Sequence, residues 1–145
     1  MTRRRTAIIA GAVGLVTALA YLHDPPWIGS VTSGMREWEH SDPRMPFRWT
    51  AGRASLFIPS DATAVMIPLR SGIPGPLMGE VEVEIRVDDR FLATIRLTDP
   101  KEWVRPELPL GNRMTHRRFR RIDLHVSRAV GQGNRGVMTG PPTIW

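Results

Sequence analysis

Residues 80–97 read EVEVEIRVDDRFLATIRL, and this pattern is the clearest indication of the fold class. Apolar side chains recur at every second position of its first half, at Val81, Val83, Ile85 and Val87. Such alternation is typical of a β-strand with one buried and one wet face. Residues 91–97 alternate in the same way, and a short acidic turn separates the two runs. The stretch therefore predicts a β-hairpin.

Short alternating or apolar runs continue along the chain on both sides of this hairpin. We expect further strands at residues 47–50, 54–58, 64–69, 103–108, 119–127 and 137–145. Thirteen glycines and thirteen prolines in 145 residues indicate frequent turns between short segments. About eight such strands predict an all-β fold, an antiparallel β-sandwich, in a domain spanning residues 47–145.

The first 23 residues carry a different signal. Three arginines, Arg3, Arg4 and Arg5, precede seventeen residues without a charge, 6–22, which are just long enough to cross a bilayer as a helix. Positive charge before an apolar run predicts a transmembrane anchor with the N-terminus in the cytoplasm and the C-terminus outside. We expect this anchor in the inner (cytoplasmic) membrane of a bacterium, with the folded domain periplasmic or extracellular. Cleavage as a signal peptide after Ala20 is the alternative.

Residues 24–46 show neither a helical nor a strand period. They contain Gly, Ser, Thr and Pro together with scattered charges. We interpret this segment as a tether between the anchor and the domain.

Composition narrows the function classes. The chain has no cysteine, which excludes disulfides, thiolate metal sites and a cysteine nucleophile. The net charge is +6, but three of the positive charges precede the apolar run, so nucleic acid is not an expected partner. The four histidines lack metal-ligand spacing, and Glu80, Glu82 and Glu84 are typical of a solvated strand face. We therefore expect no metal, no cofactor and no enzymatic activity.

Residues 87–93 read VDDRFLA, and further short motifs lie at residues 47–50, 54–59, 103–110, 135–138 and 140–144. Together these motifs resemble a jelly-roll, carbohydrate-binding-like accessory domain of bacterial membrane glycosyltransferase-like proteins. Residues 87–93 are similar to that family's VDGR-x-L-A turn, although Asp89 replaces the turn glycine. The family's domain usually follows a catalytic region with many membrane spans, whereas this chain has one apolar segment. The resemblance implies a sugar-binding-like sandwich outside the membrane, beside a separately encoded partner, and no transferase activity.

Two sets of residues are candidates for binding. Five arginines fall within nine residues, and guanidinium groups pair well with phosphate and carboxylate, so they predict contact with anions or a membrane surface. This set contains Arg113, Arg117, Arg118, Arg120 and Arg121. The alternative is a solvated loop that leads into an edge strand protected by its arginines. Trp49 and Trp103 are candidate platforms for a sugar ring, with core packing as the alternative.

These observations favour a non-enzymatic, membrane-anchored envelope protein whose outer sandwich binds a protein partner or a glycan. The alternative is a carbohydrate-binding accessory subunit that works with a separate membrane glycosyltransferase in polysaccharide or glycolipid assembly.

Overall fold

The computed structural model describes residues 3–72, 80–111, 116–129 and 135–145. One helix and one short 3-10 helix precede the strands: α1 (Arg3–His23) and η1 (Pro26–Ser30). The strands are β1 (Thr32–Met35), β2 (Arg48–Pro59), β3 (Ala64–Met66), β4 (Leu69–Arg70), β5 (Val81–Val87), β6 (Arg90–Leu97), β7 (Glu107–Pro109), β8 (Phe119–Val126), β9 (Met138–Thr139) and β10 (Thr143–Ile144).

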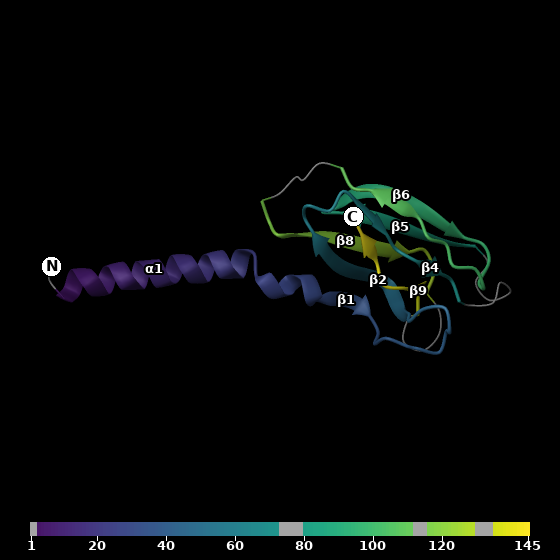
Figure 1. Cartoon of the computed structure of the whole chain (residues 1–145), viewed down its shortest axis with the longest axis horizontal. Coiled ribbons are helices and arrows are strands. Elements are labelled where there is room, and N and C mark those ends of the chain that lie inside the picture. The colour runs from purple at the N-terminus through teal and green to yellow at the C-terminus, as the bar shows by residue number, and fades with distance from the viewer. Residues whose placement is uncertain (1–2, 73–79, 112–115, 130–134) are drawn as a thin grey trace.

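The strands form two antiparallel sheets. The larger has seven strands in the order β4-β9-β2-β8-β5-β6, with β1 also paired to β2, and the smaller has the order β10-β3-β7. The prediction of an all-β antiparallel sandwich behind one N-terminal apolar helix is confirmed (Figure 1).

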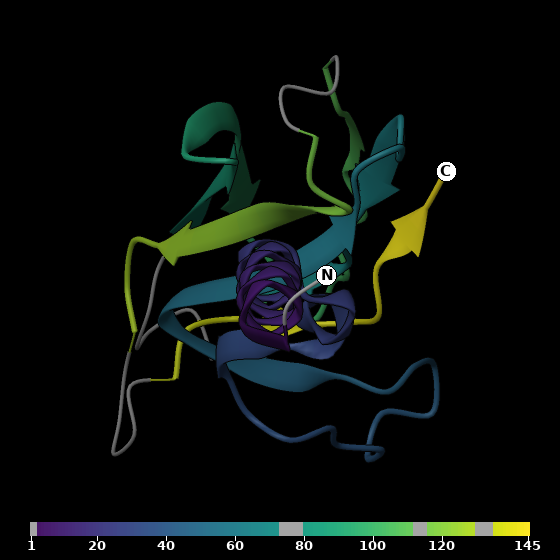
Figure 2. The ribbon, with the colours of Figure 1, turned by 90° about the vertical axis from the view of Figure 1, so that its left-hand side faces the viewer.

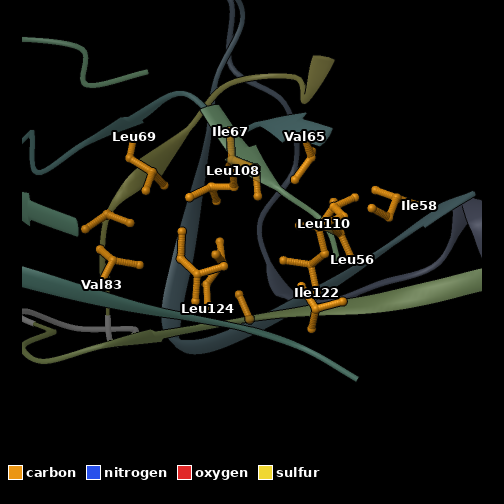
Figure 3. Packing of buried hydrophobic residues seen from close by; sticks show 14 of the residues in the cluster. Leu56, Ile58, Val65, Ile67, Leu69, Val83, Leu108, Leu110, Ile122 and Leu124 are labelled. Carbon is orange, nitrogen blue, oxygen red and sulfur yellow. The ribbon is translucent and has the colours of Figure 1, made fainter. Parts of the chain in front are cut away.

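The core lies between the two sheets. Val65 and Ile67 come from the side of the smaller sheet, and they face Leu56, Ile122 and Leu124 of the larger one (Figure 3). All five side chains are buried. Burial of a side chain of this size stabilises the fold by about 1.5–3 kcal/mol, so this layer supplies much of the driving force for folding.

The predicted hairpin is strands β5 and β6. Val87 pairs with Arg90 across a two-residue turn, and Asp88 and Asp89 both have positive φ, 50° and 67°. Positive φ at both central positions is the requirement of a type I′ turn, and Asp tolerates it better than most residues. The Asp88 carboxylate also accepts hydrogen bonds from the Arg121 backbone N–H (3.0 Å) and from Arg120 Nε (3.1 Å). The turn thus forms without the expected glycine.

Other strand boundaries differ from the expected ones. The predicted strands at 47–50 and 54–58 are one continuous strand, β2. The predicted strand at 64–69 divides into β3 and β4 around Pro68, which has no backbone N–H to donate. Strand β8 lies between β2 and β5, so it is not the edge strand considered above.

Residues 24–46 contain more structure than the expected tether. Helix η1 follows α1 almost directly, strand β1 pairs with β2, and Glu39 bridges to Phe47. The pairing of β1 with β2 shifts register between Ser33 and Met35. Gly34, which lies at this shift, has a positive φ of 63°. Backbone pairing at an irregular bulge leaves no alternating pattern in the sequence, and this explains the difference.

Helix α1 extends away from the domain, and the view along its axis places it over the sheet end where β2 and β8 lie (Figures 1 and 2). At 1.5 Å per residue its 21 residues span about 32 Å. The helix is apolar and unburied, as suits either a membrane span or a signal sequence.

We predict that Gly34→Ala releases β1 from β2. An added Cβ would lie 2.0 Å from the Arg53 carbonyl oxygen, and positive φ costs a residue other than glycine about 1–2 kcal/mol. Limited trypsin digestion of the full chain in detergent, read by mass spectrometry, is expected to show faster cleavage after Arg36. Ser33→Ala is the control and should digest like the wild type. Equal resistance of the Gly34 variant would show that the bulge does not hold β1.

Candidate ligand-binding cleft

A hollow of about 490 Å³ lies where segments distant in sequence meet beside β4 and β9. These two strands are on the side of the domain away from α1 (Figure 1). The volume is within the range of about 300–1,000 Å³ typical of small-molecule sites. The lining residues are Ser41, Asp42, Pro43, Arg44, Phe47, Arg70, Gly72, Pro100, Lys101 and Met138.

Asp42 organises one wall of this cleft. Its Oδ1 accepts a hydrogen bond from the Arg44 backbone N–H (2.9 Å), and its Oδ2 accepts from Arg70 Nη1 (3.0 Å) and Trp103 Nε1 (3.2 Å). The bonds from Arg44 and Trp103 and the charge of Arg70 lower the pKa of Asp42, against the opposing effect of burial. Asp42 is therefore an anion whose oxygens are already engaged by the protein.

Arg70 is held from several sides. Its guanidinium lies 4.7 Å from the centre of the Trp103 ring and 6.0 Å from that of Phe47, and its Nη2 donates to Met138 Sδ at 3.2 Å. The two aromatic rings are themselves in contact, with centroids 6.4 Å apart. Cation–π contacts and an ion pair together fix this guanidinium in the wall of the cleft.

The two remaining basic residues of the lining are not held in the wall as Arg70 is. Arg44 and Lys101 are exposed, and neither forms an ion pair within the part of the chain that the structure describes. Three basic side chains thus line the cleft against one acidic side chain. The cleft has a positive electrostatic character.

Neither predicted tryptophan presents an open ring. Trp49 is 6% exposed, belongs to a small cluster with Phe47 and Met138, and has the Arg135 guanidinium 5.4 Å from its ring centre. Trp103 is half-buried, and Arg70 lies over its ring. Trp49 is thus a packing residue. Trp103 borders the cleft, because it donates a hydrogen bond to Asp42 and its ring contacts Arg70.

The four described arginines of the predicted anion-binding run do not form one free surface. Arg113 lies outside the described residues. Arg118 is exposed, its backbone N–H donates to the Asp24 carboxylate at 3.0–3.1 Å, and its Nε lies 3.7 Å from Asp24 Oδ2. Arg117 is exposed and lines a second hollow of about 370 Å³ beside η1, together with Ile28.

Arg120 and Arg121 are part of the folded sheet. Arg120 is 5% exposed and donates to Asp88 Oδ2 and to the Gly111 carbonyl. Burial would lower the pKa of Arg121, but its bond to Asp123 and the charges of Asp123, Asp89 and Asp88 raise it. Both guanidinium groups are therefore neutralised by carboxylates of the hairpin and of β8.

Glu80, just before β5, and the two glutamates of β5 lie on the solvent-facing side of the strand. Glu80 and Glu82 pair with Arg96, and Glu84 pairs with Arg86. Among the described residues, no group of three His, Cys, Asp or Glu side chains is placed to hold a metal ion.

The residues that line the cleft were not singled out from the sequence. A signal does exist, because the tripeptide Asp-Pro-basic occurs at residues 42–44 and again at residues 99–101. In both, the first carboxylate accepts from the backbone N–H two residues later, at 2.9 Å and 2.7 Å. Asp followed by Pro favours such a turn. Nothing in the sequence shows that the two turns meet.

No family model matches the chain, and no curated protein matches it. Among solved structures, the chain is similar to a family two carbohydrate esterase from Clostridium thermocellum in complex with cellohexaose. The TM-score is 0.50 at 16% identity, over 79% of this chain and 31% of that one. A glycoside hydrolase family 43 arabinoxylan arabinofuranohydrolase from Bacillus subtilis, in complex with cellotetraose, gives 0.42 at 9% identity, over 79% and 24%.

The likeness to the esterase shows the fold. This chain spans about a third of the esterase's length, and the score for the arabinofuranohydrolase is too low to support an argument. The predicted β-sandwich thus has a counterpart of similar fold within a carbohydrate esterase.

We predict that Asp42→Asn destabilises the protein in a pH-dependent way. Because the pKa of Asp42 is lowered in the folded state, its contribution is present above the unfolded value of about 3.9 and is lost as the pH falls through the folded value. Urea unfolding of the full chain in detergent should give a lower midpoint for the variant at pH 7, with the difference shrinking below about pH 4. Asp61→Asn, at an exposed position, is the matched control. A difference that does not vary with pH would contradict the role of this anion.

Proposed function

We propose that this chain is a non-enzymatic, membrane-anchored protein of the bacterial envelope whose β-sandwich binds a glycan in the cleft bounded by Asp42 and Arg70. The observation that carries the proposal is the cleft itself, which has ligand-sized volume, a fixed polar wall and a position away from the apolar helix. The esterase likeness supports it at the level of fold.

The chemistry of the wall suits recognition of polar ligands. Hydroxyl groups of sugars need donors and acceptors held at fixed positions, since ordering mobile side chains weakens binding. Arg70 is already held by Asp42, Trp103 and Phe47, so little ordering remains for it. Such a wall binds without requiring a nucleophile or an acid–base pair.

An accessory role beside a separate membrane glycosyltransferase is the more specific form of this proposal. Helix α1 would place the domain in the same bilayer as such an enzyme, and the cleft would hold a growing or finished glycan outside the membrane. Co-purification of the full chain with a glycosyltransferase from the native membrane would favour this form over a protein that binds glycans alone.

We expect isothermal titration of the full chain in nanodiscs to show binding of at least one neutral or acidic envelope oligosaccharide. Ser41→Trp should weaken this binding at least tenfold, because Ser41 is an exposed lining residue and the new ring would fill the hollow. Thr94→Trp adds the same ring on strand β6, outside this lining, and should bind like the wild type. No heat from any oligosaccharide, or equal binding by the Ser41 variant, would contradict the proposal.

A second experiment tests the topology. A tag joined through a flexible linker to Trp145 should be removed by protease added to intact spheroplasts, because the charge pattern predicts the C-terminal domain outside. A cytosolic marker must stay intact in the same sample. Mass spectrometry of the mature chain then separates an anchor, which keeps residues 1–20, from a signal peptide cleaved after Ala20. Protection of the tag would contradict an extracytoplasmic domain.

A further inference from the structure

We propose that the cleft selects saccharides carrying a negative charge, a carboxylate or a phosphate, over neutral ones. This inference rests on the proposed glycan-binding function and names the class of glycan. It starts from the repeated tripeptides Asp42-Pro43-Arg44 and Asp99-Pro100-Lys101. We call these the two Asp-Pro turns.

The fold brings the two Asp-Pro turns to one place. The first lies between β1 and β2, and the second lies between β6 and β7. The proline and the basic residue of each turn line the same hollow. In each turn the aspartate accepts a hydrogen bond from the backbone N–H of the basic residue, so the stems of Arg44 and Lys101 start from fixed positions.

The acidic residue of the cleft does not cancel these charges. Asp42 has a side chain only 9% exposed, and its oxygens accept from Arg44 N–H, Arg70 and Trp103. What an incoming ligand meets at the surface is therefore the exposed ammonium of Lys101, the exposed guanidinium of Arg44 and the edge of Arg70.

These cations are of two kinds and suit different contacts. Guanidinium is planar and binds carboxylate or phosphate with two parallel hydrogen bonds, while ammonium acts as a compact point charge. A sugar acid or sugar phosphate can engage both at once while its hydroxyls meet the Asp42–Arg70 wall. A neutral sugar gains only the hydroxyl contacts with the wall. The additional contacts of the anionic group with Arg44 and Lys101 are the source of the proposed selectivity.

The test uses the full chain in nanodiscs of zwitterionic lipid, so that the bilayer adds no net charge. Titration compares tetragalacturonic acid with its methyl ester, and mannose 6-phosphate with mannose. We expect at least one charged ligand to bind ten times more tightly than its neutral counterpart, with the preference falling as salt is raised. The two pairs distinguish a carboxylate from a phosphate as the preferred group.

Paired variants show whether the Asp-Pro turns cause the preference. Arg44→Gln combined with Lys101→Gln should reduce the preference to less than about threefold. Arg53→Gln combined with Arg90→Gln removes the same charge from exposed positions outside the lining and should keep the preference. Loss of preference in the control pair would attribute it to net charge alone and would overturn the inference.

The remaining outcomes separate this inference from the function on which it rests. Equal binding of charged and neutral members refutes selectivity while glycan binding stands. Binding of poly-glutamate as tight as that of the best saccharide assigns the cleft to acidic peptides and overturns the inference. No binding of any saccharide here or in the wider set refutes glycan binding and the selectivity together.

Discussion

Strand β2 organises the larger sheet. It has twelve residues and pairs with β1, β8 and β9, so it has strand partners on both of its edges in the larger sheet. Ala54, Leu56 and Ile58 alternate along it and are all buried in the core. Buried unpaired backbone groups and exposed apolar side chains both lower the stability of a fold. Strand β2 pairs its backbone and buries its apolar face, and in doing so it fixes the positions of the neighbouring strands.

The same strand connects the end of the domain nearest α1 to the cleft. At its far end Pro59 pairs with Phe119, whose ring packs so closely on Gly29 of η1 that an added Cβ would lie 2.4 Å from it. At its near end Phe47 precedes the strand and lines the cleft. The helix junction and the wall of the cleft thus lie at opposite ends of one hydrogen-bonded strand.

Local patterning was enough to predict the strands that carry the core. The alternation of residues 80–97 predicts β5 and β6, and the apolar phase of Ile122 and Leu124 predicts β8. The position of β8 within the sheet could not be predicted, because strand order depends on pairing between residues that are far apart in the sequence. Strand β1 was missed for a different reason: it pairs through an irregular bulge and three of its four residues are exposed, so no alternating apolar pattern reveals it.

The site was less predictable than the fold. Clustering of charge in sequence singled out residues 113–121, yet Arg120 and Arg121 are neutralised by Asp88, Asp89 and Asp123. The cleft draws instead on Asp42, Arg70 and Lys101, which are far apart in the chain and come together only through the fold. The repeated tripeptide predicts two turns, but the sequence does not show that the fold brings these two turns together at one cleft.

The junction between α1 and the sheet has little slack, since η1 follows the helix within three residues and packs on Phe119. A domain on a flexible tether can reach any point of a hemisphere above its attachment point. If α1 spans a bilayer, this domain instead stays at a nearly constant height above the membrane as the protein diffuses laterally. The cleft then meets only those molecules that extend to that height.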